Sequence, residues 1–166
     1  MAKSEIERTV QPSILDRLTD EDPRTPADPP ITYAESLRNF KEGVQRDLEW
    51  LLNTRRTPMP AGDEFEELRN SLYHYGVPDI TSMSRDAIES RVRLRAQVEE
   101  ALTLFEPRLS NVRISMHEVE GEATRRELRF TVEATLRLDP TPEQVTFDTV
   151  LHFSSGEIDV LRAADA

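Results

Sequence analysis

The spacing of apolar residues changes from a helical to a strand period near Arg108, and this change restricts the fold more than any other feature. Before it, five apolar residues recur every three or four positions: Leu37, Phe40, Val44, Leu48 and Leu51. That spacing places them on one face of a helix. After Arg108, apolar and polar residues alternate, as they do in strands with one buried face. Helices followed by strands predict an α+β domain.

The helical half contains two long helices and a shorter one between them. Thr32 and Glu35 form a capping-box pattern, so we expect the first helix to begin there and to end near Asn53. A shorter helix is expected around residues 64–73. A second long helix is expected with Ser84 as its N-cap. Its expected apolar face consists of Ile88, Val92, Val98, Leu102 and Phe105.

The alternation of apolar and polar residues after Arg108 predicts three strands and a short fourth. Their expected inward residues are Val112, Ile114 and Met116, then Leu128, Phe130, Val132, Ala134, Leu136 and Leu138, then Val145, Phe147, Thr149, Leu151 and Phe153, and last Ile158 and Val160. The expected fold is therefore α+β, with two main helices packed on one face of a small antiparallel sheet of three to four strands.

The first 30 residues differ from the rest, because they hold five of the 11 prolines and no glycine. We expect residues 1–30 to form an extended arm and residues 31–166 to form a single α+β domain. Within the arm, Ile14, Leu15 and Leu18 have helical spacing and make a short amphipathic segment. Such a segment either folds back onto its own domain or docks onto a partner, and the residues leave both interpretations open.

Charge and composition exclude several classes of partner. The net charge of −11 gives no general attraction to nucleic acid or to anionic lipid, so other proteins are the expected partners. The chain has no cysteine, which suits a reducing compartment. It also has no apolar run of membrane-spanning length, and its first residues lack the apolar stretch of a signal peptide. We therefore expect a cytoplasmic protein that is not inserted into a membrane.

Few residues support a catalytic or metal-binding site. The serines lie in turns and caps rather than in a nucleophile motif. His117 and His152 share the outward phase of their strands, but no histidine pair has the spacing of zinc ligands. Glu106 is the acid most suited to burial, and the arginine two positions later favours an ion pair over proton donation. We expect no enzyme activity, no cofactor and no metal.

The triplet Glu106-Pro107-Arg108 connects the second long helix to the first strand. Pro107 disfavours helical geometry at Glu106, so the helix is expected to end at about Phe105. The result is a rigid corner whose two charges have fixed directions. Either these charges close the corner locally, or Arg108 is presented to a partner carboxylate or carbonyl. Both interpretations stay open at this point.

Four sequence blocks resemble one family. These are the block S-I-L-D-R-L from Ser13, the block V-Q-R-D-L-E-W-L-L-N-T-R from Val44, the block S-L-Y-H-Y-G-V-P-D from Ser71, and the block F-E-P-R-L from Phe105. Their order and content resemble the phage baseplate wedge family once called lysozyme-like. Within it they are most similar to the TssE baseplate subunits of bacterial type VI secretion systems.

The resemblance implies a structural role in a contractile-tail-like apparatus. It implies a position in repeated baseplate wedges beside TssF, TssG and TssK, in the cytoplasm at the base of a membrane-docked apparatus, with the first sheath ring anchored there. Carried over by position, Glu106, Pro107 and Arg108 become the sheath-facing corner, with Arg108 as the contact and Glu106 as the residue that orients it. From its amphipathic pattern alone, we infer that the segment with Ile14, Leu15 and Leu18 docks onto the wedge. The alternative is a muramidase-like enzyme that cleaves peptidoglycan with Glu106 as its acid.

Overall fold

The computed structural model of the chain describes residues 9–19, 23–24, 30–59, 61–62, 64–79, 88–117, 127–139 and 141–162. The chain divides into two compact units, Met1–Arg46 and Asp47–Ala166. Helix α2 (Tyr33–Asn53) begins in the first unit and ends in the second. Most of the expected proline-rich arm lies outside the described residues.

The first unit contains a short helix, α1 (Ile14–Leu18), and the first part of α2. Ser13 caps α1, because its hydroxyl accepts from the N–H of Asp16 while the Asp16 carboxylate accepts from the N–H of Ser13. Thr32 and Glu35 make the same reciprocal bonds at the start of α2. The expected capping box and the expected end of the helix at Asn53 are both confirmed.

The apolar face of α2 is buried as its spacing predicts. Phe40, Val44, Leu48 and Leu51 are buried, while Leu37 is half-buried. Burial of each large aliphatic side chain contributes about 1.5–3 kcal/mol, so this face is a major source of the helix's stability. Asn53, the last residue of α2, donates to the carbonyl of Ile158 and accepts from its N–H, both at 2.8 Å. These two bonds join the end of the helix to strand β4 (Ile158–Arg162).

The remaining helices of the second unit differ in part from expectation. The predicted helix over residues 64–73 is two shorter pieces, α3 (Glu66–Arg69) and the 3₁₀ helix η1 (Leu72–His74). Helix α4 (Ile88–Phe105) is confirmed, but its predicted apolar face is wrong at Ile88 and Val92, which are exposed. The buried residues are Leu94, Val98, Ala101 and Leu102, which recur at helical spacing without them. The expected cap Ser84 lies outside the described residues.

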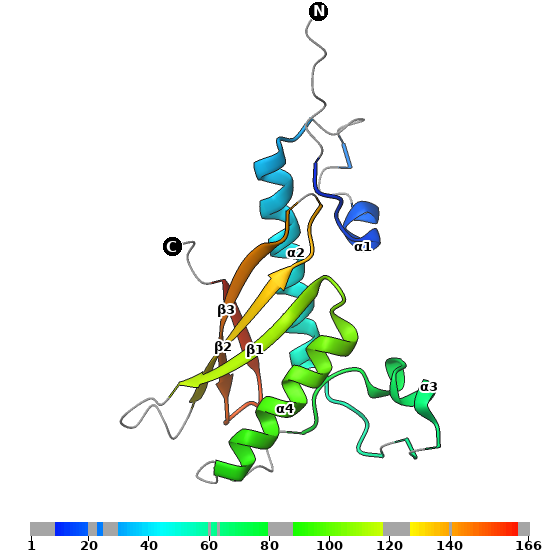
Figure 1. Cartoon of the computed structure of the whole chain (residues 1–166), viewed down its shortest axis with the longest axis vertical. Coiled ribbons are helices and arrows are strands. Elements are labelled where there is room, and N and C mark those ends of the chain that lie inside the picture. Colours follow the sequence, from blue (N-terminus) through cyan, green and yellow to red (C-terminus); the bar gives the residue numbers. More distant parts are fainter. Residues whose placement is uncertain are drawn as a thin grey trace, which may run out of the picture. The chain divides into compact units, whose positions relative to one another are not determined.

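Four strands form one antiparallel sheet in the order β1-β2-β3-β4 (Figure 1). They are β1 (Leu109–His117), β2 (Glu127–Leu136), β3 (Glu143–His152) and β4. Most of the predicted inward residues are buried, but Val112, Met116, Leu138 and Phe153 are only half-buried, and the last two lie just beyond the ends of β2 and β3. The described residues of the other face are mostly exposed and polar. One face of the sheet is therefore turned to the core and the other to solvent, and the predicted α+β fold is confirmed. No helix in the described part of the chain has the length and apolar character needed to span a membrane.

A β-bulge in β1 explains how two residues an odd number of positions apart point to the same side. Leu109 and Ile114 are both buried, although strict alternation would put them on opposite faces. The pairing of β1 with β2 shifts register between Ser110 and Arg113, and Asn111 has a φ of 53°. Asparagine tolerates this left-handed conformation better than most residues. The bulge thus allows the strand to leave the corner at Arg108 with Leu109 and Ile114 both in the core.

Candidate assembly surfaces

The corner between α4 and β1 is fixed by its backbone. The helix ends at Phe105, as Pro107 predicts. The N–H of Leu109 donates to the carbonyl of Glu106 (3.1 Å), and the N–H of Arg137 donates to the carbonyl of Arg108 (2.8 Å). Leu109 is buried and Pro107 is exposed. The corner therefore presents its proline on the surface while both flanking segments are held.

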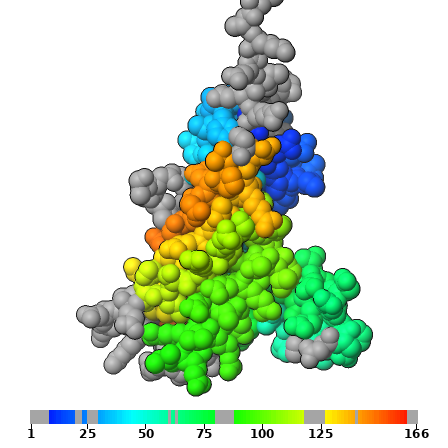
Figure 2. Space-filling view, in the orientation of Figure 1, coloured from blue at the N-terminus to red at the C-terminus, as the bar shows by residue number. Residues whose placement is uncertain are grey.

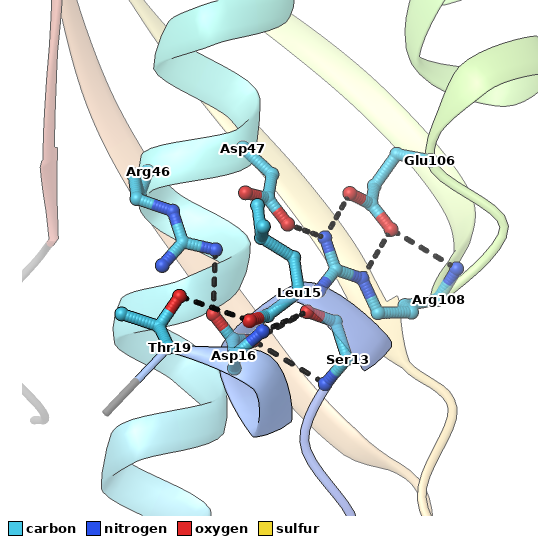
Figure 3. A network of polar contacts seen from close by, with 8 residues as sticks. All are labelled: Ser13, Leu15, Asp16, Thr19, Arg46, Asp47, Glu106 and Arg108. Atoms are coloured by element: carbon cyan, nitrogen blue, oxygen red, sulfur yellow. Dashed lines mark hydrogen bonds and ion pairs between the residues drawn. The ribbon is translucent and has the colours of Figure 1, made fainter.

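The Arg108 side chain joins two carboxylates (Figure 3). Its Nε donates to Glu106 Oε1 at 2.6 Å and its Nη2 donates to Glu106 Oε2 at 2.5 Å. The same Nη2 donates to Oδ2 of Asp47 at 2.6 Å, across 61 positions of sequence. The exposed fractions of the Glu106, Arg108 and Asp47 side chains are 5%, 20% and 23%. Such a two-pronged arginine–carboxylate contact fixes orientation as well as charge.

The electrostatics of the corner favour the charged guanidinium. Burial alone would lower the pKa of Arg108, but the hydrogen bonds and charge of Glu106, followed by those of Asp47, raise it above its usual range. Burial raises the pKa of Tyr75, and the charges of Asp47 and Glu106 raise it further. The Tyr75 ring lies edge-on to Phe105, with the ring centroids 5.3 Å apart. The corner is thus packed against aromatic side chains as well as ion-paired.

The structure supports the local interpretation of the triplet, in which Glu106 and Arg108 close the corner. It also places Glu106 where it orients Arg108, so a contact with a partner and a structural role are compatible. General acid catalysis fits this geometry poorly. Both Glu106 oxygens accept hydrogen bonds from a guanidinium, whereas a general acid must present a proton to its substrate.

The short helix α1 is attached to α2 through polar contacts. Asp16 Oδ1 lies 2.7 Å from Nη2 of Arg46, and the N–H of Val10 donates to Ser36 Oγ at 3.0 Å (Figure 3 shows the Asp16–Arg46 pair). Partial burial would raise the pKa of Asp16, but hydrogen bonds from Ser13 and the interaction with Arg46 lower it below its ordinary value. Gly43 of α2 leaves room for the Asp16 carboxylate, since a Cβ at position 43 would lie 3.1 Å from Asp16 Oδ2.

The apolar residues of α1 are exposed. Ile14 and Leu18 keep 76% and 78% of their surface exposed, and Leu15 keeps half. In the first unit, therefore, the segment folds back through its polar side and leaves its apolar residues on the surface. The segment therefore folds back onto α2, and docking of its apolar residues onto a partner stays a prediction.

The two strand histidines contact separate partners on the exposed face of the sheet. His117 Nε2 lies 2.6 Å from Thr131 Oγ1, and that hydroxyl donates to Asp148 Oδ1 at 2.9 Å. His152 Nε2 lies 2.9 Å from Asp159 Oδ2. These contacts explain why Thr131 is buried on an otherwise open face. In the described ranges, no three histidine, cysteine, aspartate or glutamate side chains form a group that could hold a metal ion.

Sequence reasoning missed the residues of α2 that hold the two candidate surfaces. Asp47 holds Arg108 and Arg46 holds Asp16, yet these are consecutive positions on an ordinary amphipathic helix. Their only signal in the sequence is that two oppositely charged residues stand next to each other between the apolar positions Val44 and Leu48. Partners separated by tens of residues become visible only when the chain is folded.

Comparison with known proteins identifies the family. Residues 38–141 match the family model of baseplate wedge protein gp25, a segment of more than half of the 166-residue chain. It runs from within α2 to beyond β2 and includes the corner at Glu106-Pro107-Arg108. No curated protein sequence matches the chain. The chain therefore belongs to the baseplate wedge protein gp25 family, which supplies structural components of phage-tail-like baseplates.

Proposed function

We propose that this chain is a non-enzymatic adaptor of a type VI secretion baseplate, where it joins the wedge subunits TssF, TssG and TssK and anchors the sheath. It acts in the cytoplasm, at the base of the membrane-docked apparatus. The observation that carries the proposal is the orientation of α1, which is fixed by the Asp16–Arg46 ion pair and leaves Ile14, Leu15 and Leu18 exposed. An exposed apolar face on a held segment is typical of a surface that docks onto another protein.

The proposed sheath contact is the corner at Glu106-Pro107-Arg108. Its support is rigidity, because the backbone is bonded at Glu106 and Arg108 and the guanidinium is held by two carboxylates. A surface fixed before assembly loses little conformational entropy on binding. Pro107 is exposed at the tip, and Arg108 retains part of its surface, so the sheath would contact both.

The wedge contact is tested by binding to the purified complex of TssF, TssG and TssK. The double variant Ile14→Ser/Leu18→Ser removes two exposed apolar side chains and leaves the Asp16–Arg46 pair intact. Burial of each side chain at an interface contributes about 1.5–3 kcal/mol, so we expect affinity to fall by more than about tenfold. Ile88→Ser/Val92→Ser is the matched control, since both residues are exposed on α4. Equal affinity for the two variants would reject the wedge-docking role.

The sheath contact is tested by co-purification of sheath and wedge subunits with the tagged chain. Arg108→Ala is compared with a variant of equal thermal stability, such as Val98→Ala in the core. We expect Arg108→Ala to lose sheath selectively while it retains the wedge subunits. If both variants recover the same amount of sheath, the corner is structural only.

The enzymatic alternative is tested with a turbidity assay on purified cell wall. We expect no clearing by the wild-type protein. Clearing that disappears in Glu106→Gln would replace the adaptor with a muramidase.

A further inference from the structure

A small lobe leaves the second unit between the end of α2 and the start of α4. It comprises the described residues between 57 and 75, with α3 and η1 inside it, and we call it the α3–η1 lobe. A parallel bridge between Arg55 and Val77 closes its base. There the N–H of Arg56 donates to the carbonyl of Val77 at 2.8 Å, and the N–H of Val77 donates to the carbonyl of Thr54 at 2.9 Å. The two ends of the lobe are thus hydrogen-bonded to each other, as in a closed loop.

Gly76 allows this closure. Its φ is +101°, and a Cβ there would lie 2.2 Å from the carbonyl oxygen of Thr54. A side chain at position 76 would therefore be strained and would also displace the backbone that forms the base. This requirement gives a physical reason for the glycine in the block S-L-Y-H-Y-G-V-P-D.

Contacts inside the lobe hold it in one conformation. The Tyr73 hydroxyl donates to the carbonyl of Met59 at 3.0 Å, and the N–H of Ala61 donates to Nε2 of His74, also at 3.0 Å. His74 is buried, and its ring lies 5.4 Å from that of Tyr73 between centroids. Tyr75 attaches the lobe to α4 through Phe105. A partner would therefore encounter a preformed surface.

This lobe carries an unusual concentration of exposed apolar side chains. They are Met59, Phe65, Leu68, Leu72 and Tyr73, with Leu72 exposed at 79% and Met59 at 72%. Figure 2 shows the lobe in cyan-green shades as a protrusion beside the green surface of α4. Single exposed apolar residues are ordinary, but several on a short, internally bonded segment indicate an interaction surface.

A cavity of about 280 Å³ lies where the lobe meets the end of α4. Its lining includes Arg56, Arg69, His74 and Glu100, together with Asn70 and the apolar residues Leu104 and Phe105. Because Nε2 of His74 accepts from Ala61, the neutral ring carries its proton on Nδ1, so its second nitrogen is a donor. Among the described lining residues, two guanidinium groups stand against one carboxylate, and the neutral imidazole adds a hydrogen-bond donor but no charge. In a chain of net charge −11, this is a locally basic pocket.

We propose that the α3–η1 lobe and this pocket together bind a segment of another baseplate protein in which apolar side chains flank an aspartate or glutamate. The apolar side chains pack against Leu72 and its exposed neighbours, and the carboxylate enters the pocket beside Arg56 and Arg69. Arginine favours this ligand because its planar donors match the two oxygens of a carboxylate. The overall negative charge disfavours a polyanion such as nucleic acid. The proposal rests on the adaptor role and adds a second partner surface to it.

The experiment measures binding of the full chain to the purified TssF–TssG–TssK complex at low and moderate salt. Arg56→Gln/Arg69→Gln removes the charges of the pocket, and Leu72→Ser removes the most exposed apolar side chain. Arg93→Gln/Arg113→Gln and Leu161→Ser are the matched controls, since all three residues are exposed outside the lobe. We expect each lobe variant to weaken binding at least about tenfold and the controls to change it less than about twofold. Binding of the double arginine variant should also depend less on salt than wild-type binding.

A cross-linking measurement identifies the occupant. The amine introduced by Arg69→Lys keeps the positive charge and is coupled by carbodiimide to a carboxylate in contact with it. We expect the coupled carboxylate to belong to a wedge subunit and to lie between apolar residues. Unchanged affinity of the lobe variants, or coupling only within this chain or to a second copy of it, would overturn the proposal. If the wild-type chain does not bind the complex at all, the adaptor role itself fails, and the two failures are thereby distinguished.

Discussion

Substitution of Arg108 by alanine should destabilise the protein much more than loss of an ordinary surface arginine. The variant removes three side-chain hydrogen bonds of 2.5–2.6 Å to Glu106 and Asp47. It leaves Glu106, whose side chain is 5% exposed, as a buried charge whose remaining described bond comes from the backbone N–H of residue 108. The cost therefore comes mainly from the carboxylate that is left behind.

The size of the effect follows from burial. Breaking a buried ion pair by removing one partner costs about 3–5 kcal/mol. Because Arg108 and Asp47 retain about a fifth of their side-chain surface, we expect the lower end, about 3 kcal/mol. In a chain of this size that corresponds to a fall in Tm of roughly 6–12 °C. Arg129→Ala is the matched control, since Arg129 is exposed and pairs with Glu127 at 3.2 Å, and it should cost about 0.5 kcal/mol.

Urea denaturation of four proteins tests this reasoning: wild type, Arg108→Ala, Arg129→Ala and Glu106→Gln/Arg108→Ala. The double variant removes the uncompensated charge, so it should recover at least about 1 kcal/mol relative to Arg108→Ala. The reasoning is refuted if Arg108→Ala costs no more than Arg129→Ala, or if the double variant is less stable than Arg108→Ala.

Three other substitutions test separate parts of the structure. Asn53→Ala leaves the N–H and carbonyl of Ile158 without their bonds, so it should cost about 2–3 kcal/mol and speed hydrogen exchange in β4; unchanged exchange would contradict this. Thr149→Val should stabilise by about 1 kcal/mol in urea denaturation, because its buried hydroxyl has no hydrogen-bond partner among the described residues; a lower midpoint would count against it. The lowered pKa of Asp16 stabilises the attachment of α1 above the ordinary value of 3.8, and this contribution is lost as pH falls through the folded-state pKa. NMR signals of α1 should therefore change in that range, and Arg46→Ala should move the change to higher pH; an identical midpoint in both proteins would refute the assignment.

Periodicity predicted the main elements because burial on one side leaves a direct trace in sequence. The stripe of α2 and the alternation in β2 and β3 each correspond to observed buried faces. The cap at Thr32 and the helix end before Pro107 were predictable from local chemistry. In each case, the residues that determine the structure lie within a few positions of one another.

The errors arose where position in the fold decided burial. Ile88 and Val92 are apolar but lie outside the buried face of α4, so composition alone misassigned them. The bulge at Asn111 interrupts the alternation of β1, and an asparagine within a strand does not specify a bulge without its partner strand. The short helix over residues 64–73 was divided because Ser71 caps a separate 3₁₀ turn.

The candidate surfaces were predictable only in part. The triplet Glu106-Pro107-Arg108 and the segment Ile14–Leu18 stand out in sequence through a charged corner and an amphipathic spacing. Their partners Asp47 and Arg46, by contrast, became evident from the folded chain. The α3–η1 lobe was not predicted as a surface, because the sequence does not show whether the apolar residues of so short a segment are buried or exposed.

The adaptor role is tested most directly by sheath assembly in living cells. In a type VI-competent strain that lacks this chain and carries a fluorescent sheath subunit, we would count extended sheaths after complementation with wild type, Ile14→Ser/Leu18→Ser or Ile88→Ser/Val92→Ser. The account predicts abundant sheaths with wild type and with the α4 control, and few with the arm variant. Normal sheath numbers in the strain without the chain would contradict the adaptor role, and normal numbers with the arm variant would contradict the docking surface assigned to α1.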